Sequence, residues 1–397
     1  MSTTQAFPPP PKEDIDWAKL GASAVEDDGH AECQYDAKTG CWSEPVLVKD
    51  AYIKVHGLAP GLNYGMQAYE GMKAYRSPED QIYVFRPADH AARMVTSCAT
   101  VSIPAIPPPI FLRAVNLAVA RNARLVPPHA SPALLYIRPV AFACDAHLAL
   151  TRPQHFRFAV YVAPATAYHG VAASSQDVLV MESFDRAAPR GTGHAKVGGN
   201  YAPVVRWSDD AKARGFGLTL HLDSRTQTEV EEFSTSGFVG VRCETGGRRF
   251  VLTVPDSESI VASVTSDSVL ALARAKGWGV EKRRIHFSEL RYFSEVFALG
   301  TAAALVPIKS ITRESTGDKF VFNGGNAGPG PCATELTHAL TDMLKGRSSD
   351  EFGWRVRVQD VPESTVLDAA DGVASDRSDV YDDRKSLPAL DMVQIKA

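Results

Sequence analysis

Several patterns that would assign a function at once are absent from this chain of 397 residues. Six cysteines are scattered without a CxxC pair, which argues against a disulfide scaffold, a zinc site or a redox motif. We therefore expect free, mostly buried thiols and no metal. No apolar run is long enough to span a membrane. The net charge of −4 lacks the basic excess that marks a nucleic-acid-binding protein.

The N-terminal segment also lacks the marks of a targeting sequence. It reads MSTTQAFPPPPKEDIDW, with neither the apolar core of a signal peptide nor the arginines of a mitochondrial leader. The expected location of the protein is therefore the cytoplasm.

Helix and strand signals occur throughout the chain, but they do not alternate regularly. Residues 110–126 place apolar side chains at helical spacing, and residues 263–277 begin with hydroxyl caps and end in a glycine. The segments ALLYIRPVAFA and FRFAVYVAP are rich in aromatic and β-branched residues, which is typical of strands. Without regular βαβ alternation, the pattern favours an α+β fold over a doubly wound sheet.

The length of the chain suits two domains. A small and polar stretch at residues 163–177 contains a proline and a glycine, which indicates a connector between them. The expected division is an extended arm at 1–30, a small N-terminal domain at 31–165, a connector at 166–176, a large domain at 177–375 and a polar tail at 376–397.

A single lysine, Lys196, stands among glycines in the segment RGTGHAKVGGNYAP. The segment fits neither the phosphate loop GxxxxGK[ST] nor the dinucleotide motif GxGxxG. A solvated surface lysine is the ordinary interpretation. However, Gly191, Gly193, Gly198 and Gly199 are typical of a backbone that closely approaches another group. A partly desolvated amine at such a place can form an imine with a carbonyl, and pyridoxal 5'-phosphate (PLP) is the common partner in that chemistry.

A PLP site needs a phosphate-binding group, and the sequence offers candidates. Arg86 in VFRP and Arg138 in YIRP each stand between a strand and a proline, and a guanidinium suits a phosphate or a carboxylate. The helix start at SVTSD offers the backbone N–H groups of Val264 and Thr265 to an anion. Surface ion pairs and simple helix capping remain open as alternatives for these residues.

The carboxylate that a pyridine nitrogen requires is less well defined. Glu229, Glu231 and Glu232 cluster in TEVEEFSTSGF, and strand alternation puts Glu231 and Glu232 on opposite faces. One of the two can point inward, and the composition alone does not decide which.

Taken together, five segments resemble one family, the branched-chain amino acid aminotransferases of PLP fold type IV. They are LNYGMQAYEGMKAYR, VFRP with ARM after it, LYIRP, GTGHAKVGGNYA and GTAAALVP, in the family order within residues 30–310. DIDWAKLG and EEFSTSGF resemble a fungal-type branch of that family. The resemblance implies a two-domain α+β fold, with a smaller N-terminal α/β domain and a larger C-terminal domain on a β-barrel-like core. It also implies a homodimer.

The resemblance assigns expected roles to individual residues. Lys196 is expected to bind PLP covalently and to shuttle the substrate proton as general acid and base. Glu232 is expected to pair with the pyridine nitrogen, Arg86 to bind the phosphate and Tyr201 to hydrogen-bond the phenolic oxygen. Further cofactor contacts are expected from Thr235, Val264, Thr265 and Thr301. The expected substrate-binding residues are Tyr64, Tyr69, Tyr136, Arg138, Tyr168, Ala302 and Ala303. Tyr64 is the residue expected to cross to the partner subunit.

The chain departs from the family pattern at several positions. Gly237 stands where many members carry asparagine. The helix start reads ASVTS instead of Pro-Gly-Val-Thr-Arg, so the backbone amides survive but the arginine does not. Tyr69 stands where phenylalanine is frequent, which makes the pocket more polar. Ala303 and Val306 replace a cysteine pair of some animal members, so thiol redox control is not expected.

The expected reaction transfers the amino group of L-leucine, L-isoleucine or L-valine to 2-oxoglutarate, which gives branched 2-oxo acids and L-glutamate. Tyr136, Tyr201 and Arg138 offer the aromatic wall and the cation that one pocket needs for branched and acidic side chains. An alternative keeps the fold and changes the donor to a D-amino acid, an (R)-amine or an aliphatic amino acid of secondary metabolism. A non-catalytic PLP-binding paralogue is disfavoured, because Lys196 and Glu232 are both present.

Overall fold

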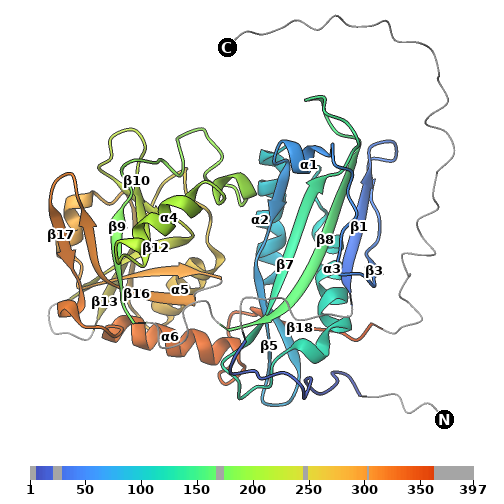
Figure 1. The fold of residues 1–397 in the computed structure, drawn as a ribbon. Coiled ribbons are helices and arrows are strands. Elements are labelled where there is room, and N and C mark those ends of the chain that lie inside the picture. Colours follow the sequence, from blue (N-terminus) through green and yellow to red (C-terminus); the bar gives the residue numbers. More distant parts are fainter. Residues whose placement is uncertain (1–5, 21–28, 167–173, 245–248, 302–303, 362–397) are drawn as a thin grey trace, which may run out of the picture.

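Two lobes, each built around its own β-sheet, make up the computed structural model (Figure 1). The structure describes residues 6–20, 29–166, 174–244, 249–301 and 304–361. The expected polar tail and most of the expected connector lie outside these ranges, as do Tyr168, Ala302 and Ala303.

The first lobe contains a curved antiparallel sheet. Within the described residues it has nine strands, in the order β18-β6-β5-β7-β8-β1-β2, with β3 paired to β1 and β4 paired to β7. The strands are β1 (His30–Asp36), β2 (Cys41–Trp42), β3 (Val46–Val48), β4 (Gln67–Tyr69), β5 (Met72–Arg76), β6 (Ile82–Phe85), β7 (Leu134–Ala143), β8 (His155–Ala165) and β18 (Arg355–Arg357).

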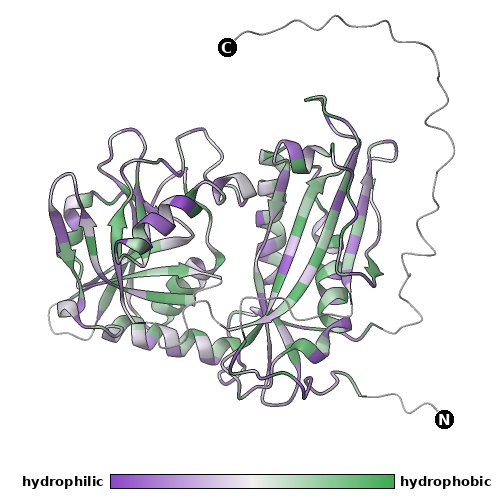
Figure 2. Cartoon of the chain, in the orientation of Figure 1, coloured by the Kyte–Doolittle hydropathy of each residue, from purple (hydrophilic) through white to green (hydrophobic). Residues whose placement is uncertain are grey.

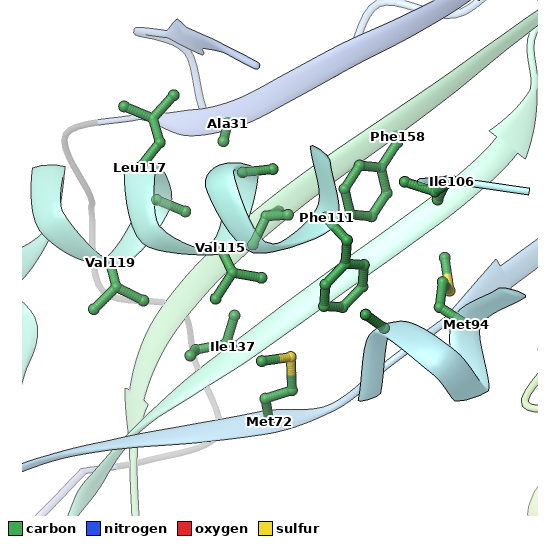
Figure 3. Close-up of a cluster of buried hydrophobic side chains, with 14 of the residues drawn as sticks. Ala31, Met72, Met94, Ile106, Phe111, Val115, Leu117, Val119, Ile137 and Phe158 are labelled. Carbon is green, nitrogen blue, oxygen red and sulfur yellow. The ribbon is translucent and has the colours of Figure 1, made fainter. Parts of the chain in front are cut away.

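Two long helices pack on this sheet, α2 (Pro87–Thr100) and α3 (Pro108–Arg121). Both begin with proline in the first turn, where a backbone N–H has no helical acceptor. Figure 3 shows Phe111 of α3 beside Phe158 of β8, and their rings stack with centroids 5.5 Å apart. A short helix, α1 (Pro60–Asn63), precedes β4.

The second lobe contains a closed barrel. Six of the strands that the structure describes pair in the ring β11-β10-β9-β16-β15-β12, and the pairing of β12 with β11 closes it. This finding confirms the β-barrel-like core and the α+β class. The strands of the lobe are β9 (Gln176–Val180), β10 (Leu218–Leu222), β11 (Val230–Phe233), β12 (Ser236–Cys243), β13 (Phe250–Pro255), β14 (Gly279–Arg283), β15 (Glu295–Gly300), β16 (Ala304–Arg313) and β17 (Asp318–Val321).

The helices of the second lobe are α4 (Val204–Ala213), α5 (Val264–Ala275) and α6 (Pro331–Leu344). The bounds of α5 confirm the helix expected at residues 263–277. The side chain of Ser263 caps it by accepting a hydrogen bond from the Ser266 N–H at 3.1 Å. Gly277 follows its end with a positive φ of 73°, which a glycine adopts without steric cost.

The described chain does not end in the second lobe. Figure 1 shows α6 running along the second lobe toward the first. After α6, the strand β18 pairs antiparallel with β6 and so becomes part of the first sheet. Trp354 packs edge-to-face on Phe85 at 5.7 Å and secures this return.

Figure 2 shows hydrophobic residues concentrated in the strands of both lobes and hydrophilic residues on many of the loops. Among the described helices, none is long and apolar enough to cross a membrane. The six cysteines all fall within the described ranges and are free thiols. Three of them are buried, so the expectation of mostly buried thiols holds for only half.

Candidate active site

The loop that carries Lys196 connects β9 to α4 and is fastened to the first lobe. The backbone N–H of Lys196 donates to Ser97 Oγ of α2 at 2.9 Å. Its carbonyl accepts from the Tyr69 N–H of β4 at 3.0 Å, and Val197 forms a β-bridge with Ala68. The lysine therefore lies where the two lobes meet.

Asn200 holds the same loop from within. Its side-chain N–H groups donate to the carbonyls of Thr192 at 2.7 Å and Ala195 at 2.9 Å, and its Oδ1 accepts from the Thr192 hydroxyl at 2.8 Å. These bonds fix a glycine-rich segment that would otherwise be costly to order.

The amine of Lys196 lies between two tyrosine rings. Its Nζ donates to the Tyr201 hydroxyl at 3.2 Å. The same atom lies 4.5 Å from the ring centroid of Tyr69 and 4.8 Å from that of Tyr201. The two rings meet edge-to-face with centroids 5.3 Å apart. The amine is thus held by one hydrogen bond and two cation–π contacts.

These surroundings change the acidity of the two phenols in opposite directions. Burial alone would raise the pKa of Tyr201, but the charges of Lys196 and Arg186 outweigh it and lower that pKa. Burial and the neighbouring Tyr201 raise the pKa of Tyr69 well above its usual range. Tyr201 is therefore the phenol suited to carry or share negative charge, and Tyr69 keeps its proton.

A buried carboxylate lies behind Tyr201. Glu232 is 5% exposed and forms an ion pair with Arg186. Burial raises the pKa of Glu232 to about 7, and the charge of Arg186 opposes this rise. Arg186 also donates to the Ser234 carbonyl at 3.0 Å and lies over the Tyr201 ring at 5.4 Å. Arg186 was not among the expected site residues, because nothing in its local sequence marks it.

The strand alternation expected for the neighbouring glutamate is present. Glu231 accepts from the Ser257 hydroxyl at 2.9 Å, whereas Glu232 pairs with Arg186. Only Glu232 of the two lines the main cavity of this region. The structure thus distinguishes two carboxylates that the composition left equivalent.

That cavity has a volume of about 800 Å³ and runs from Glu232 to the start of α5. Arg86 lines it from the N-cap position of α2, with a left-handed φ of 47° that is unusual outside glycine. Its guanidinium binds Asp89 at 2.8 Å, Asp267 at 2.7 Å and the Ser268 hydroxyl at 2.8 Å. Arg86 is therefore fixed at one end of the cavity, where it shares its charge with two carboxylates.

The start of α5 forms the same end of the cavity. Val264 and Thr265 are its first two residues, whose N–H groups have no helical acceptor. Ser266 Oγ is buried there without a hydrogen-bond partner among the described residues. A Cβ on Gly237 would lie 2.9 Å from that oxygen, so the glycine keeps this corner open. The corner has the polarity and the room for an anion.

Three expected substrate residues lie together on the other side of Lys196. Arg138 donates to the Tyr136 hydroxyl at 3.1 Å. Its guanidinium lies over the ring of Tyr69 at 4.9 Å and over that of Tyr136 at 5.2 Å. Gly71 permits this packing, because a Cβ there would lie 2.2 Å from the Tyr136 hydroxyl oxygen.

Other expected residues lie apart from this group. Tyr64 is 43% exposed, donates to the Leu148 carbonyl and lines a separate cavity with Met66. Thr235 is exposed in the turn between β11 and β12, and Thr301 is partly buried directly after β15. Their roles remain predictions, as do those of Tyr168, Ala302 and Ala303, which lie outside the described residues.

Comparisons with known proteins bear on this arrangement. A family model described as amino-transferase class IV matches residues 67–311. The aminotransferase poxL of Penicillium oxalicum is 51% identical over 360 residues, which cover 91% of this chain and 97% of that protein. The branched-chain amino acid aminotransferase gloG of Glarea lozoyensis is 49% identical over 352 residues, with 88% and 98% covered.

A solved structure agrees with these relatives. The crystal structure of the Escherichia coli branched-chain amino acid aminotransferase superposes with a TM-score of 0.65 and 26% sequence identity. The match covers 83% of this chain and all of that one.

Proposed function

The chain belongs to the class IV aminotransferases, and from this membership we propose that it is a PLP-dependent branched-chain-amino-acid transaminase. It moves the amino group of L-leucine, L-isoleucine or L-valine to 2-oxoglutarate, and the products are branched 2-oxo acids and L-glutamate. The observation that carries the proposal is the amine of Lys196, held 3.2 Å from the Tyr201 hydroxyl and near enough to Glu232 for its charge to oppose the raised pKa of that carboxyl.

The residues present fit PLP. The corner of the cavity with Arg86 and the unpartnered Ser266 Oγ suits a phosphate, and Gly237 leaves it room. Glu232 suits the protonated ring nitrogen, because a cation there would favour the carboxylate over the protonated form that burial favours. Tyr201 suits the phenolic oxygen, and Lys196 is the amine for the covalent link.

PLP, when bound, supplies the electron sink that stabilises charge left at the α-carbon of the amino acid. The protein supplies the proton transfers and the orientation. With PLP held there, Lys196 Nζ would take the α-proton of the donor as general base and release it again as general acid. Arg186 holds Glu232, and Tyr201 keeps the lysine amine on the reacting side.

The substrate wall supports a donor with a branched apolar side chain and an acceptor with a carboxylate. Tyr69 and Tyr136 offer aromatic surface, and Arg138 lies over both rings with its charge in reach. The phenol of Tyr69 favours a second candidate, an aliphatic amino acid that carries a polar group and belongs to secondary metabolism. A D-amino acid or an (R)-amine is the remaining alternative on the same fold.

We also propose a cytoplasmic homodimer. The six free thiols suit a reducing compartment. Leu62, Tyr64 and Leu150 are 62%, 43% and 79% exposed and belong to neighbouring parts of the first lobe, which suits contact with a second copy.

The test is a donor panel with PLP-loaded protein and 2-oxoglutarate, following glutamate formation. The panel contains L-leucine, L-isoleucine, L-valine, L-phenylalanine, D-alanine and (R)-1-phenylethylamine, with the Lys196→Ala variant as the inactive control. Fast turnover of the three branched donors is the expected result. Turnover of only D-alanine or only the amine would be consistent with the fold but would contradict the proposed donors. If the cofactor absorbance is intact but no donor is turned over, the proposal that these amino acids are the donors is wrong.

A further inference from the structure

A buried polar cluster lies beside the lysine loop and has no part in the steps described above. Glu70 directly follows β4 and is 0% exposed. Arg93 of α2 binds its carboxylate in bidentate geometry, with Nε at 2.6 Å from Oε1 and Nη2 at 2.7 Å from Oε2. His90, one turn earlier on α2, places its Nδ1 2.8 Å from Oε2.

The charges within this cluster are matched. Burial would raise the pKa of Glu70, but Arg93 and His90 outweigh it and hold that pKa well below its usual range. Burial lowers the pKa of His90 and Glu70 opposes this, and the Nδ1 of the ring lies within hydrogen-bond distance of the carboxylate. Glu70 and Arg93 therefore form a charged, bidentate pair, which is the most directional ion pair available in proteins.

Arg93 makes a third contact, with the other lobe. Its Nη1 donates at 2.8 Å to the carbonyl of Ala262, which lies directly before the cap of α5. Arg93 also lines the cavity that contains Glu232. The guanidinium of Arg93 thus links Glu70, which follows β4, to the segment that sets the position of the α5 N-terminus.

The residues on either side of Glu70 contact or belong to the proposed substrate wall. Tyr69 directly precedes Glu70, and its ring lies against the amine of Lys196. Gly71 directly follows Glu70 and lies next to the Tyr136 hydroxyl. The Gly71 N–H donates to Glu70 Oε2 at 3.2 Å, so the carboxylate also fixes this turn. A shift of Glu70 would move the surroundings of both tyrosines.

We propose that Arg93 is a positioning residue, which sets the distance between the tyrosine wall of the substrate pocket and the phosphate end of the cofactor cavity by holding Glu70 and Ala262 together. The proposal rests on the proposed function. Its consequence is coupling: loss of the guanidinium weakens cofactor binding and donor recognition together, although Arg93 acts through other groups.

The test compares Arg93→Met and Arg93→Lys with wild type and with Arg113→Met. Arg113 is a matched control, since it forms a bidentate pair with Glu44 at 2.8 and 2.7 Å and is half exposed in the same lobe. The measurements are PLP affinity by absorbance titration, KM and kcat for L-leucine, the pH midpoint of the bound-cofactor absorbance, and Tm.

We expect Arg93→Met to weaken PLP binding by at least about tenfold and to raise KM by at least about tenfold, with a shifted pH midpoint. Arg113→Met leaves all three within about twofold. Arg93→Lys keeps the charge but not the fork, and therefore shows the same coupled losses with a smaller fall in Tm than Arg93→Met. If Arg93→Met does not fold, the lysine variant decides the matter.

Normal PLP affinity, KM and pH midpoint in Arg93→Lys, with at most a lower Tm, would reduce Arg93 to a structural role and overturn the proposal. A loss of donor recognition without a change in PLP affinity would overturn the coupling. If wild type turns over no donor, the proposed function fails, whereas the PLP affinity and the pH midpoint of the Arg93 variants still test the position of the cavity walls.

Discussion

The amine of Lys196 and the hydroxyl of Tyr201 lie 3.2 Å apart, on a loop that α2 and β4 hold from the first lobe. The second lobe supplies Arg186, whose charge also lowers the pKa of Tyr201. The hydrogen-bonded pair of Lys196 and Tyr201 therefore depends on groups from both lobes, and changes in either lobe reach the same two atoms.

Replacing Lys196 by alanine removes the amine that we propose as nucleophile and proton carrier. We expect transaminase turnover to fall by a factor on the order of 10³ or more, and the absorbance of lysine-bound cofactor to disappear. Lys276→Ala is the control, because Lys276 pairs with Glu335 on the surface at 2.8 Å. Retained cofactor absorbance in Lys196→Ala would assign the covalent link to another amine.

Glu232 makes the stability of the cofactor-free protein depend on pH. Its folded-state pKa of about 7 lies above the ordinary 4.5, so the folded state binds this proton more tightly. The stabilising contribution is fully present below the ordinary pKa and is lost as pH rises to the folded pKa. About 3 kcal/mol of unfolding free energy is involved.

Urea unfolding of the cofactor-free protein across this pH range measures the effect. Glu232→Gln cannot titrate, so its unfolding free energy lacks this fall, whereas Glu335→Gln on the surface behaves as wild type. Identical pH profiles for wild type and Glu232→Gln would contradict the raised pKa.

Arg86 provides the fixed cation of the cavity. Arg86→Leu is expected to weaken PLP binding by about 10- to 100-fold, which corresponds to the loss of hydrogen bonds to a charged group. Absorbance titration with PLP measures the affinity, and Arg357→Leu on the exposed face of β18 is the control. An unchanged affinity for PLP would contradict the proposal that Arg86 binds the phosphate.

Phe111 lies in the buried core of the first lobe. Phe111 is 1% exposed and stacks on Phe158 (Figure 3). Phe111→Ala is expected to cost about 3–5 kcal/mol of unfolding free energy, because it leaves a cavity between α3 and the sheet. Denaturant unfolding followed by circular dichroism measures this, with the 78% exposed Tyr52→Ala as a control of small effect.

Much of the fold could be predicted where local signals are strong. The capped helix α5 and the long strands β7 and β8 follow from hydroxyl caps, glycine and β-branched residues. The barrel was expected only from the family resemblance. Its closure depends on the pairing of β11 with β12, which no periodicity in the sequence encodes. Strand β18 was not anticipated, because it is only three residues long.

The site residues likewise differ in how strongly the local sequence marks them. Lys196 and Arg86 stand in marked local sequences, a glycine cluster and a strand–proline corner. Arg186 does not, since its importance comes from a partner 46 residues away. Arg93 stands in the ARM segment, which the family resemblance marked without a role, and its partner Glu70 is 23 residues away. Buried ion pairs between distant segments leave no periodic trace, and only the folded geometry brings such partners together.

The pairing of β18 with β6 bears on any attempt to divide this chain. A fragment that ends with β8 would leave the hydrogen-bonding edge of β6 open and Phe85 without Trp354. Such a fragment would be prone to aggregate through that edge. Supplying residues 350–361 as a separate peptide would be expected to restore its solubility, so the first lobe is assembled from two segments of the chain that lie on either side of the second lobe in the sequence.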